Sequence, residues 1–457
     1  MPEPTVNLLS ARAARPRVLL VNPAIYDFSA YDFWSRPYGL LAVAGQLRGQ
    51  ADMTLFDYLD RRQQRSSRRL RADQWGRGEY AWQEMPKPSP LRHLPRRWRR
   101  FGRSREEFRR TLQQQGPFDF VLVQSMMTYW YLGVDEVIQD VRQACPTARV
   151  VVGGVYATLC PRHAQSLGPD LVIRGRDIQP LWNAMGIEGQ AAQPPLWEAY
   201  RQSAEQAAKN SDVGVMKLSD GCPFHCTYCG VHRMHDGFAP KPLDRAIREL
   251  DLLLAAGAKH IAFYDDALLY QPQPALAPLL KQAAASESPP AFHTPNALNA
   301  RFVTAETARM LVAGGFKTFY LGLESNEDAW QRQTGGKVQP REFASAVGQL
   351  RSAGAAADSI TAYVIIGHPR SDRQRVEETM QFAHRLGTRI MLAEFSPVPG
   401  TPDGDACAKH IDLSEPLWHN KTAYAITALG EAEVNRLKSC SREWNARLST
   451  GSAWATS

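Results

Sequence analysis

Gly221-Cys-Pro-Phe-His-Cys-Thr-Tyr-Cys-Gly230 lies near the middle of this 457-residue chain and is its most specific pattern. Its cysteines, Cys222, Cys226 and Cys229, are separated by three residues and then by two. Thiolates hold iron–sulfur clusters, usually four to a cubane, and this motif offers only three. The two glycines and Pro223 predict a loop that wraps a cofactor, because on a plain helix the cysteines would merely form a stripe. The motif therefore predicts a cluster in which one iron has no protein ligand.

Two other interpretations of the cysteines stay open. They could be core residues, or they could bind zinc together with His225 or His232. Zinc sites usually have two pairs of ligands, and the second pair is missing here. The chain has seven cysteines, an odd number, and the clustering of three indicates metal ligation in a reducing compartment rather than a disulfide framework. The spacing favours an iron–sulfur cluster over zinc.

Strand patterns alternate with helical periodicity on the carboxyl-terminal side of the motif. Six strand–helix units predict a partial (β/α)6 barrel over residues 213–405, and its chemistry is expected at the carboxyl ends of the strands. A small helical extension is expected over residues 406–457. The predicted barrel strands are Val213–Leu218, His260–Tyr264, Ala291–Thr294, Thr318–Gly322, Thr361–Ile366 and Ile390–Phe395.

A second series of strands and helices precedes the motif. The alternation over residues 17–190 predicts a parallel, doubly wound, Rossmann-like sheet, which would bind ligands beyond the carboxyl ends of its strands. Residues 1–16 indicate a tail, and residues 191–212, which are rich in Ala, Gln and Pro, indicate a linker. The predicted strands are Arg17–Pro23, Met53–Asp57, Phe118–Gln124, Arg149–Gly154 and Asp170–Arg174.

A basic insertion over residues 61–115 interrupts the first sheet. Residues 61–110 contain 17 Lys and Arg against 5 Asp and Glu. Their local net charge of 17 − 5 = +12 is larger than the net charge of +8 of the whole chain. Arginines interleaved with Trp75, Trp82 and Trp98 suit base stacking and phosphate contacts on RNA. We favour instead a helical pair, solvated on one side and packed by the tryptophans on the other. A lid over the amino-terminal ligand crevice is the third interpretation.

The cysteine motif resembles the signature of the radical S-adenosylmethionine (SAM) superfamily, CxxxCxΦC, with Tyr228 before the last cysteine. The resemblance implies a 4Fe–4S cluster whose open iron chelates SAM. A reductant such as flavodoxin or ferredoxin would supply an electron to the cluster, and transfer of this electron to SAM would cleave it to a 5′-deoxyadenosyl radical. Later strand ends also match, in the segments 263–266, 321–325, 364–369 and 395–402. The SAM-binding residues that the resemblance implies are Tyr228, Asp265, Asp266, Glu324, Ser325 and Gly367.

The amino-terminal half resembles the cobalamin-binding domain that precedes the radical SAM barrel in one subgroup. The two resemblances together cover about residues 17–405. An Asp-x-His-x-x-Gly motif is missing, so cobalamin would have no histidine ligand. Arg174–Ile178 stands where relatives have Gly-Glu-x-Glu, which leaves a degenerate scaffold as the alternative. The cobalamin-binding residues that the resemblance implies are Pro23, Ser125, Thr128, Gly153, Gly154 and Tyr156.

With cobalamin, the resemblance implies a methyltransferase acting on a small metabolite or a peptide; without it, a rearrangement, a cyclisation or another group transfer. A methylthiotransferase that modifies RNA is disfavoured, since such enzymes carry three further amino-terminal cysteines. A non-enzymatic iron–sulfur or zinc protein leaves the SAM-like segments unexplained. No catalytic residue is predicted, but His293, Asn296 and Arg301 follow the third barrel strand and are candidate substrate contacts.

We expect a cytoplasmic protein that makes no membrane contact. No stretch approaches the roughly 18 uninterrupted apolar residues that span a bilayer. The amino terminus has no apolar core followed by a cleavage site, so a secretory signal is not expected.

Overall fold

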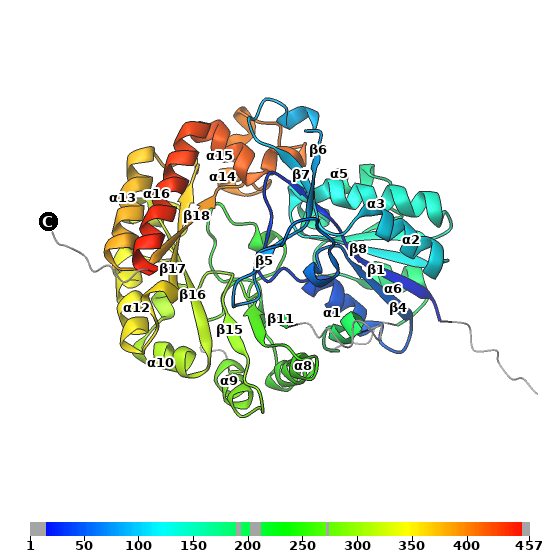
Figure 1. Cartoon of the computed structure of the whole chain (residues 1–457), viewed down its shortest axis with the longest axis horizontal. Coiled ribbons are helices and arrows are strands. Elements are labelled where there is room, and N and C mark those ends of the chain that lie inside the picture. The colour runs from blue at the N-terminus through cyan, green and yellow to red at the C-terminus, as the bar shows by residue number, and fades with distance from the viewer. Residues whose placement is uncertain (1–14, 189–192, 202–211, 271–273, 450–457) are drawn as a thin grey trace, which may run out of the picture.

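The structure is a computed structural model that describes residues 15–188, 193–201, 212–270 and 274–449. Two parallel β-sheets, each with helices packed on it, lie side by side (Figure 1). The first sheet belongs to the amino-terminal part of the chain, and the second begins with the strand that precedes the cysteine motif. The predicted fold class is confirmed: a doubly wound domain, a partial barrel and a helical extension.

The amino-terminal sheet has five parallel strands in the spatial order β10-β9-β8-β1-β4. Val18 and Leu20 of its central strand face one core, whereas Leu19 faces the other. Because both faces are buried, the strand is a continuous apolar run. The direction in which strands are added reverses between β1 and β8, and doubly wound sheets bind ligands at this switch point. The strands are β1 (Arg17–Asn22), β4 (Asp52–Asp57), β8 (Phe120–Ser125), β9 (Arg149–Gly154) and β10 (Leu171–Val172).

Helices cover both faces of this sheet. Helix α1 (Tyr38–Gln46) buries Leu41 in one core. Helices α2 (Arg105–Gln115) and α3 (Tyr131–Ala144) bury Phe108 and Val137 in the other. Helix α2 begins at a capping box formed by Ser104, so its first turn has the side-chain acceptor that free backbone N–H groups need.

The second sheet has six parallel strands in chain order, β11-β14-β15-β16-β17-β18. In the described part of the chain its edge strands do not pair with each other, so the sheet is an open, partial barrel. Every predicted strand of both sheets begins and ends within two residues of an observed one. The strands are β11 (Val213–Met216), β14 (His260–Phe263), β15 (Ala291–His293), β16 (Phe316–Glu324), β17 (Ile360–Ile366) and β18 (Arg389–Glu394), and helices α8 (Leu243–Ala255), α9 (Leu276–Ala284), α10 (Ala305–Ala313), α12 (Pro340–Ser352) and α13 (Arg373–Arg385) lie between them.

The carboxyl-terminal extension is helical, as expected, and covers the last barrel strand. Its long helix α16 (Glu431–Ser449) lies beside α13 in Figure 1. Asn445 of this helix exchanges hydrogen bonds with the backbone of Ile390 in β18, at 2.7 and 2.8 Å. The edge of the open barrel is thereby protected by side chains of α16. The shorter helix α15 (Lys421–Leu429) also belongs to the extension, and the single turn α14 (Pro402–Asp405) directly precedes the extension.

The predicted helical pair in the basic insertion is wrong. The insertion contains one α-helix, α2, at its end, and before it come β5 (Gly78–Glu79), β6 (Trp82–Met85) and β7 (Trp98–Phe101), which pair with one another or with strands β2 (Ile25–Asp27) and β3 (Tyr31–Asp32). Four prolines between residues 86 and 95 exclude a continuous helix there. The partner strands come from residues 25–32, before β4, so no local periodicity announces this pairing.

Carboxylates inside the molecule bind much of the positive charge of the insertion. Arg100 and Glu136 pair at 2.6 Å and are 6% and 3% exposed. Arg105 and Arg109 both bind Asp140 at 2.8 Å. The arginines therefore have a structural role that the composition did not indicate. Further pairs join Arg61 with Asp32, Arg62 with Asp60, Arg68 and Arg71 with Glu79, Arg77 with Asp73, Arg96 with Glu431, and Arg103 with Glu107.

The insertion also joins distant parts of the molecule, and its strand β5 lies between the two sheets in Figure 1. Arg96 binds Glu431, at the start of α16, at 3.1 Å. Trp75 packs edge-on against His260 of β14, and Arg77 donates a hydrogen bond to the hydroxyl of Tyr320 in β16. The basic segment thus connects the amino-terminal domain to the barrel and to the extension.

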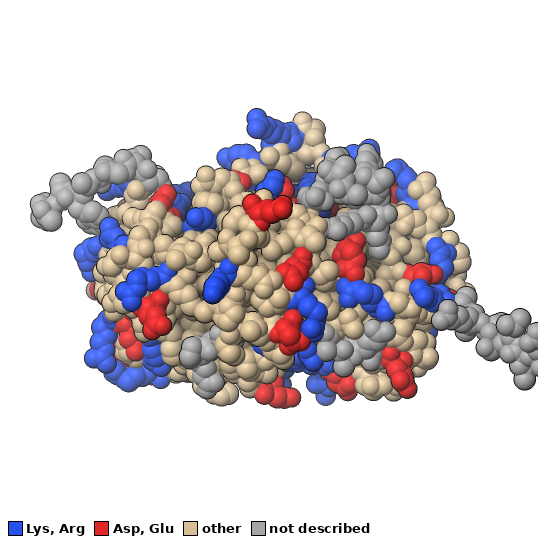
Figure 2. Space-filling view, turned by 90° about the horizontal axis from the view of Figure 1, so that it is seen from below, with Lys and Arg blue, Asp and Glu red and all other residues tan. Residues whose placement is uncertain are grey.

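The surface shows no broad area of one charge on the face drawn in Figure 2, where basic and acidic side chains are interspersed. Within the described residues, none of the helices combines the length and the apolar character that crossing a membrane requires.

Candidate functional site

The three cysteines lie in the loop that follows β12 (Ser219–Asp220), close to the carboxyl end of β11. Cys226 is buried, and the other two are half-buried. Burial raises the pKa of all three thiols, that of Cys229 to about 11, and the charge of a neighbouring cysteine in the motif raises each further. The three thiols therefore influence one another electrostatically. A bound metal removes the protons from such thiols outright.

The cysteine loop turns sharply at Gly221. Its φ of +75° lies in the left-handed region, and a side chain there would collide with the carbonyl of Gly237. No group of three His, Cys, Asp or Glu side chains in the described residues converges on a single metal ion. Cysteines that hold a cubane bind different iron atoms, so they need not converge on one point.

Thr227, between two of the cysteines, is held from two sides. Its N–H donates to the carbonyl of Thr334 at 3.2 Å, and its carbonyl accepts from the N–H of Asp403 at 3.0 Å. Its hydroxyl donates to the carboxylate of Asp403. Gly335, next to Thr334, lies so close to the loop that an added Cβ would be 3.0 Å from Cα of Cys226. Segments after β16 and β18 therefore fix the middle of the motif.

Asp403 was not predicted from the sequence and is the centre of a buried network. Its carboxylate is 1% exposed and accepts hydrogen bonds from Thr227, from Nε2 of His368 at 3.1 Å and from Nε of Arg370 at 2.8 Å. Burial alone would raise the pKa of Asp403, but these hydrogen bonds outweigh it and hold the pKa well below its ordinary value. The carboxylate therefore stays charged and links the cysteine loop to the segments that follow β17 and β18.

Lys337 was also missed, and its positive charge acts to lower the pKa of all three cysteine thiols. Burial lowers the pKa of Lys337, but the negative charges of Glu324 and of the three cysteines outweigh burial and raise it. Glu324 ends β16 with a left-handed φ of +61°, where the register with β17 shifts. An added Cβ on Gly322 would lie 3.1 Å from Oε1 of Glu324 and 3.3 Å from Nζ of Lys337. A carboxylate and an ammonium group thus lie together beside the cysteines, an arrangement complementary to a zwitterionic amino acid.

The two predicted aspartates behave differently. Both oxygens of Asp265 accept from the N–H of Leu218 at 3.0 Å, and one accepts from the hydroxyl of Ser219 at 2.6 Å. Burial raises the pKa of Asp265 to about 6. Asp266 is half-buried, and its charge raises the pKa of two of the cysteine thiols, Cys222 and Cys229. Asp265 therefore joins β14 to β11, whereas Asp266 faces the cysteine loop.

The remaining predicted SAM residues have packing roles. Tyr228 stacks on Trp330, with ring centroids 5.9 Å apart. The hydroxyl of buried Ser325 accepts from the N–H of Glu327 at 3.3 Å. Gly367 has a φ of +74°, and an added Cβ there would lie 3.2 Å from a backbone atom of α15.

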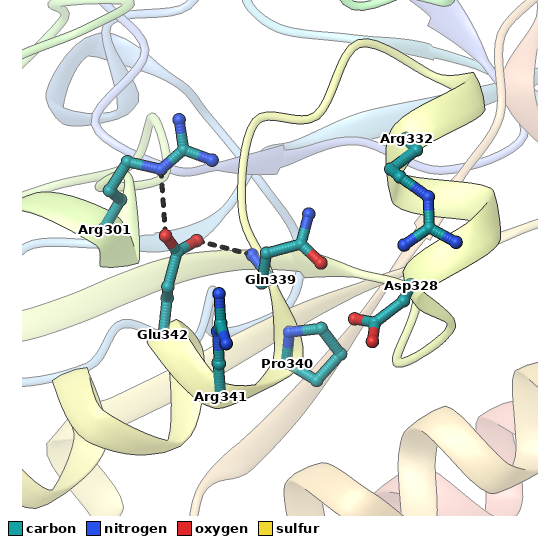
Figure 3. A pocket seen from close by; sticks show the side chains of 7 residues that line it. All are labelled: Arg301, Asp328, Arg332, Gln339, Pro340, Arg341 and Glu342. Carbon is teal, nitrogen blue, oxygen red and sulfur yellow. Dashed lines mark hydrogen bonds and ion pairs between the residues drawn. The ribbon is translucent and has the colours of Figure 1, made fainter.

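The three candidate substrate residues are not brought together. His293 is fully buried and stacks on Trp34 at 4.3 Å, and burial lowers its pKa to about 2, so it is a neutral core histidine. The amide of Asn296 donates to the carbonyl of Tyr264 at 2.9 Å. Arg301 binds Glu342 at 3.1 Å beside a separate cavity of roughly 640 Å³ (Figure 3). The aromatic residue that covers His293 comes from the amino-terminal domain, which the barrel sequence does not reveal.

The residues suggested for cobalamin do lie together, at the carboxyl ends of β1, β8 and β9. The hydroxyl of Ser125 donates to the carbonyl of Gly153 at 2.8 Å, and Gly154, with a φ of +101°, approaches the same strand end. Thr128 contacts His419 of the extension at 3.0 Å, and the hydroxyl of buried Tyr156 contacts His163 at 2.6 Å. Pro23 is buried beside them at the end of β1.

This edge of the first sheet faces the cysteine loop. An added Cβ on Gly230, the last residue of the motif, would lie 3.7 Å from Leu159, which ends helix α4 (Val155–Leu159) of the amino-terminal domain. A cavity of roughly 280 Å³ opens between the two domains here. Its lining residues are Thr158, Leu159, Arg174, Gly175, Arg233 and Pro399.

Residues 216–383 match the family described as the Radical SAM superfamily, and the match includes the cysteine loop, Glu324 and Lys337. This part of the chain is a radical SAM domain. Enzymes of this superfamily use a 4Fe–4S cluster and SAM, which agrees with the three-cysteine motif. The predicted family is thereby confirmed.

Curated relatives of this radical SAM protein include methylthiotransferases and a methyltransferase. It is 24% identical over 286 residues to the threonylcarbamoyladenosine tRNA methylthiotransferase MtaB of Thermotoga maritima, covering 59% of this chain and 64% of the relative. It is 30% identical over 195 residues to an uncharacterized methyltransferase of Pyrococcus horikoshii, covering 41% and 40%. The chain thus spans less than two thirds of the length of these relatives.

Solved radical SAM structures share the fold over most of the chain. The methyltransferase TsrM of Kitasatospora setae, with cobalamin and a [4Fe-4S] cluster bound, has a TM-score of 0.61 at 14% identity, covering 89% of this chain and 85% of its own. The cobalamin-dependent SAM radical enzyme OxsB, with aqua-cobalamin and SAM bound, has a TM-score of 0.56 at 12% identity, covering 94% and 61%. At these identities the likeness shows the two-domain fold.

Proposed function

We propose that this protein is a cobalamin-dependent radical SAM methyltransferase acting on a small metabolite or a peptide. The observation that carries the proposal is that the ligand edge of the doubly wound sheet faces the cysteine loop, with Leu159 packed beside Gly230. A methyl carrier at the first edge and SAM at the second would share one space between the domains, where binding sites often form. The fold shared with TsrM and OxsB, whose structures hold cobalamin, supports this choice of cofactor.

The donor set suits a 4Fe–4S cluster. Cys222, Cys226 and Cys229 would each hold one iron, leaving the fourth for SAM. When bound, the cluster supplies the single electron that splits SAM into methionine and a 5′-deoxyadenosyl radical. Lys337 would offset the negative charge that the thiolates bring. Since cluster thiolates need a reducing compartment, we place the activity in the cytoplasm, with flavodoxin or ferredoxin as the reductant.

The site also suits the methionine part of SAM. Glu324 and Lys337 offer opposite charges side by side, which complement the ammonium and carboxylate groups of an amino acid. Asp266 adds a second carboxylate whose charge acts on Cys222 and Cys229. Asp265 and Ser325, whose polar groups are bonded within the protein, would act by holding the strand ends rather than by contacting SAM.

The residues at the amino-terminal edge suit a flat macrocycle. Gly39 in α1 is exposed at this edge, and an added Cβ there would meet only Oε1 of Gln124, at 3.6 Å. Gly153 and Gly154 likewise place backbone, not side chains, at the end of β9. Pro23, Ser125, Thr128 and Tyr156 surround them as the remaining candidates. No Asp-x-His-x-x-Gly motif is present, so the corrin would bind without a histidine ligand from this chain.

The test is anaerobic reconstitution with iron, sulfide and cobalamin, followed by gel filtration and absorption spectroscopy. The wild-type protein is expected to retain corrin. Gly39→Leu should block its binding, because the new side chain occupies the open edge. Gly348→Leu is the matched control, since this helical glycine has no atom within 4 Å of an added Cβ. A wild-type protein that retains no corrin would contradict the proposal, as would a Gly39 variant that binds it normally.

Modification of RNA is the second candidate. The tRNA methylthiotransferase MtaB among its relatives favours it. The ion pairs of the basic insertion disfavour it, because many of its arginines, such as Arg100, Arg105 and Arg109, already bind carboxylates. A filter-binding assay with bulk tRNA at low and at physiological salt separates the two candidates. Binding that survives physiological salt would support RNA as the substrate.

A further inference from the structure

A cavity of roughly 640 Å³ opens among the segments that follow β15 and β16. It lies between η6 (Ala300–Phe302), α11 (Asp328–Gln333) and the start of α12. Figure 3 shows Arg332 and Asp328 on one side of the opening and Arg301, Glu342 and Arg341 on the other. Gln339 and Pro340 complete the lining.

The charges around this cavity are not balanced within the protein. Glu342 is engaged, because one oxygen binds Nε of Arg301 at 3.1 Å and the other accepts from the N–H of Gln339 at 2.7 Å. Arg332 and Arg341 are exposed, and neither forms an ion pair with a carboxylate of the described residues. Asp328 is the one remaining acid in the lining. Two guanidinium groups are therefore available to a negatively charged partner.

The same lining touches the cysteine loop along two short paths. The guanidinium carbon of Arg301 lies 6.0 Å from the ring centre of Phe224, which stands between two of the cysteines. Arg301 also donates to the carbonyl of Gly336 at 2.7 Å, and the adjacent Gly335 packs on the backbone of Cys226. The surface that carries Arg332 and Arg341 is therefore connected to the cysteine loop through Arg301.

We infer that this surface, lined by Arg301, Arg332 and Arg341, is the docking site of an acidic one-electron donor protein. The inference rests on the proposed function, since the cluster must gain one electron and the donor must lose one before SAM is cleaved. A flavin donor would pass from its hydroquinone to its semiquinone form. The lining is polar and open, unlike the mostly apolar pockets that enclose small ligands. Small, charge-steered interfaces are typical of transient electron-transfer partners.

The test is stopped-flow reduction of the reconstituted cluster, followed by its loss of visible absorbance. Flavodoxin hydroquinone is the anionic donor, and reduced methyl viologen, a cation, is the control reductant. For the double variant Arg332→Glu, Arg341→Glu we expect the second-order rate constant with flavodoxin to fall at least about tenfold at low salt, because steering of this kind changes association rates by about 10–10³. The rate with methyl viologen should not fall. Arg385→Glu, at the end of α13, is the matched charge reversal elsewhere.

The outcomes separate this inference from the proposed function. Equal flavodoxin rates for wild-type, double-variant and Arg385 proteins would overturn the docking site, even while methyl viologen still drives SAM cleavage. Absence of any cluster in the wild-type protein would overturn the proposed function itself. If the double variant loses its cluster, the neutral pair Arg332→Gln, Arg341→Gln gives the same test, with an expected fall of about threefold or more.

Discussion

Replacing Asp403 tests whether the buried network holds the cysteine loop. Its carboxylate accepts from half-buried Thr227, from buried His368 and from Arg370, whose side chain is 44% exposed. A hydrogen bond to a charged group contributes about 1.5–3 kcal/mol, and the share of the exposed arginine is reduced by solvent. Asp403→Ala should therefore lower the free energy of unfolding by about 3–5 kcal/mol. Asp403→Asn, which keeps one acceptor, should lose about half of that.

The assay pairs urea unfolding of the iron-free protein with the iron content per chain after reconstitution. Both Asp403 variants should hold less iron than wild type, because Thr227 lies between two cluster cysteines. Asp405→Ala is the control, since this exposed carboxylate accepts from the nearby N–H of Gly400, and the variant should lose less than about 1 kcal/mol of unfolding free energy. The reasoning is refuted if Asp403→Ala matches Asp405→Ala in both stability and iron content.

Four further results are expected. Cys226→Ala should lose the cluster absorbance and SAM cleavage, whereas Cys440→Ala should keep both. SAM cleavage by the Cys226→Ala variant would contradict the assignment of the three cysteines as cluster ligands. Because folding raises the pKa of Asp265 to about 6, its stabilising contribution is present below about pH 4 and is lost as the pH rises through 6. In urea titrations, the free energy of unfolding of the wild-type protein should fall by up to about 3 kcal/mol relative to that of Asp265→Asn between pH 4 and about 6. A difference between the two proteins that does not change with pH would contradict this. Lys337→Gln should make the reduction potential of the cluster more negative, by on the order of 60 mV, in an EPR-monitored titration. An unchanged potential would mean that Lys337 does not lie close enough to the cluster to affect it. Arg100→Met leaves a buried carboxylate unpaired and should cost about 3–5 kcal/mol in unfolding experiments, and a loss below 1 kcal/mol would mean the pair is dispensable.

The parts of the fold that could be predicted are those set by local pattern. Buried parallel strands are continuous apolar runs, such as residues 18–21, and their alternation with helices leaves few architectures. The cysteine motif is equally local, because its spacing is contained in eight residues. These features were therefore found from the sequence alone.

The parts that could not be predicted depend on contacts between distant segments. Lys337 and Asp403 join the site because loops after β16 and β18 return to the cysteine motif, more than 100 residues away. The charge of the insertion suggested a solvated or RNA-binding surface, yet carboxylates such as Glu136 neutralise it from another helix. His293 was expected to face substrate, and Trp34 of the other domain covers it. Only hints existed in the sequence, such as Gly335-Gly336 before the lysine.

The most direct test of the central claim measures the products of SAM in one reconstituted sample with cobalamin and one without. If methyl carrier and radical source share the space between the two domains, the complete sample with its substrate should form both S-adenosylhomocysteine and 5′-deoxyadenosine, and omission of cobalamin should abolish the first. Formation of 5′-deoxyadenosine alone, at the same rate in both samples, would contradict the account.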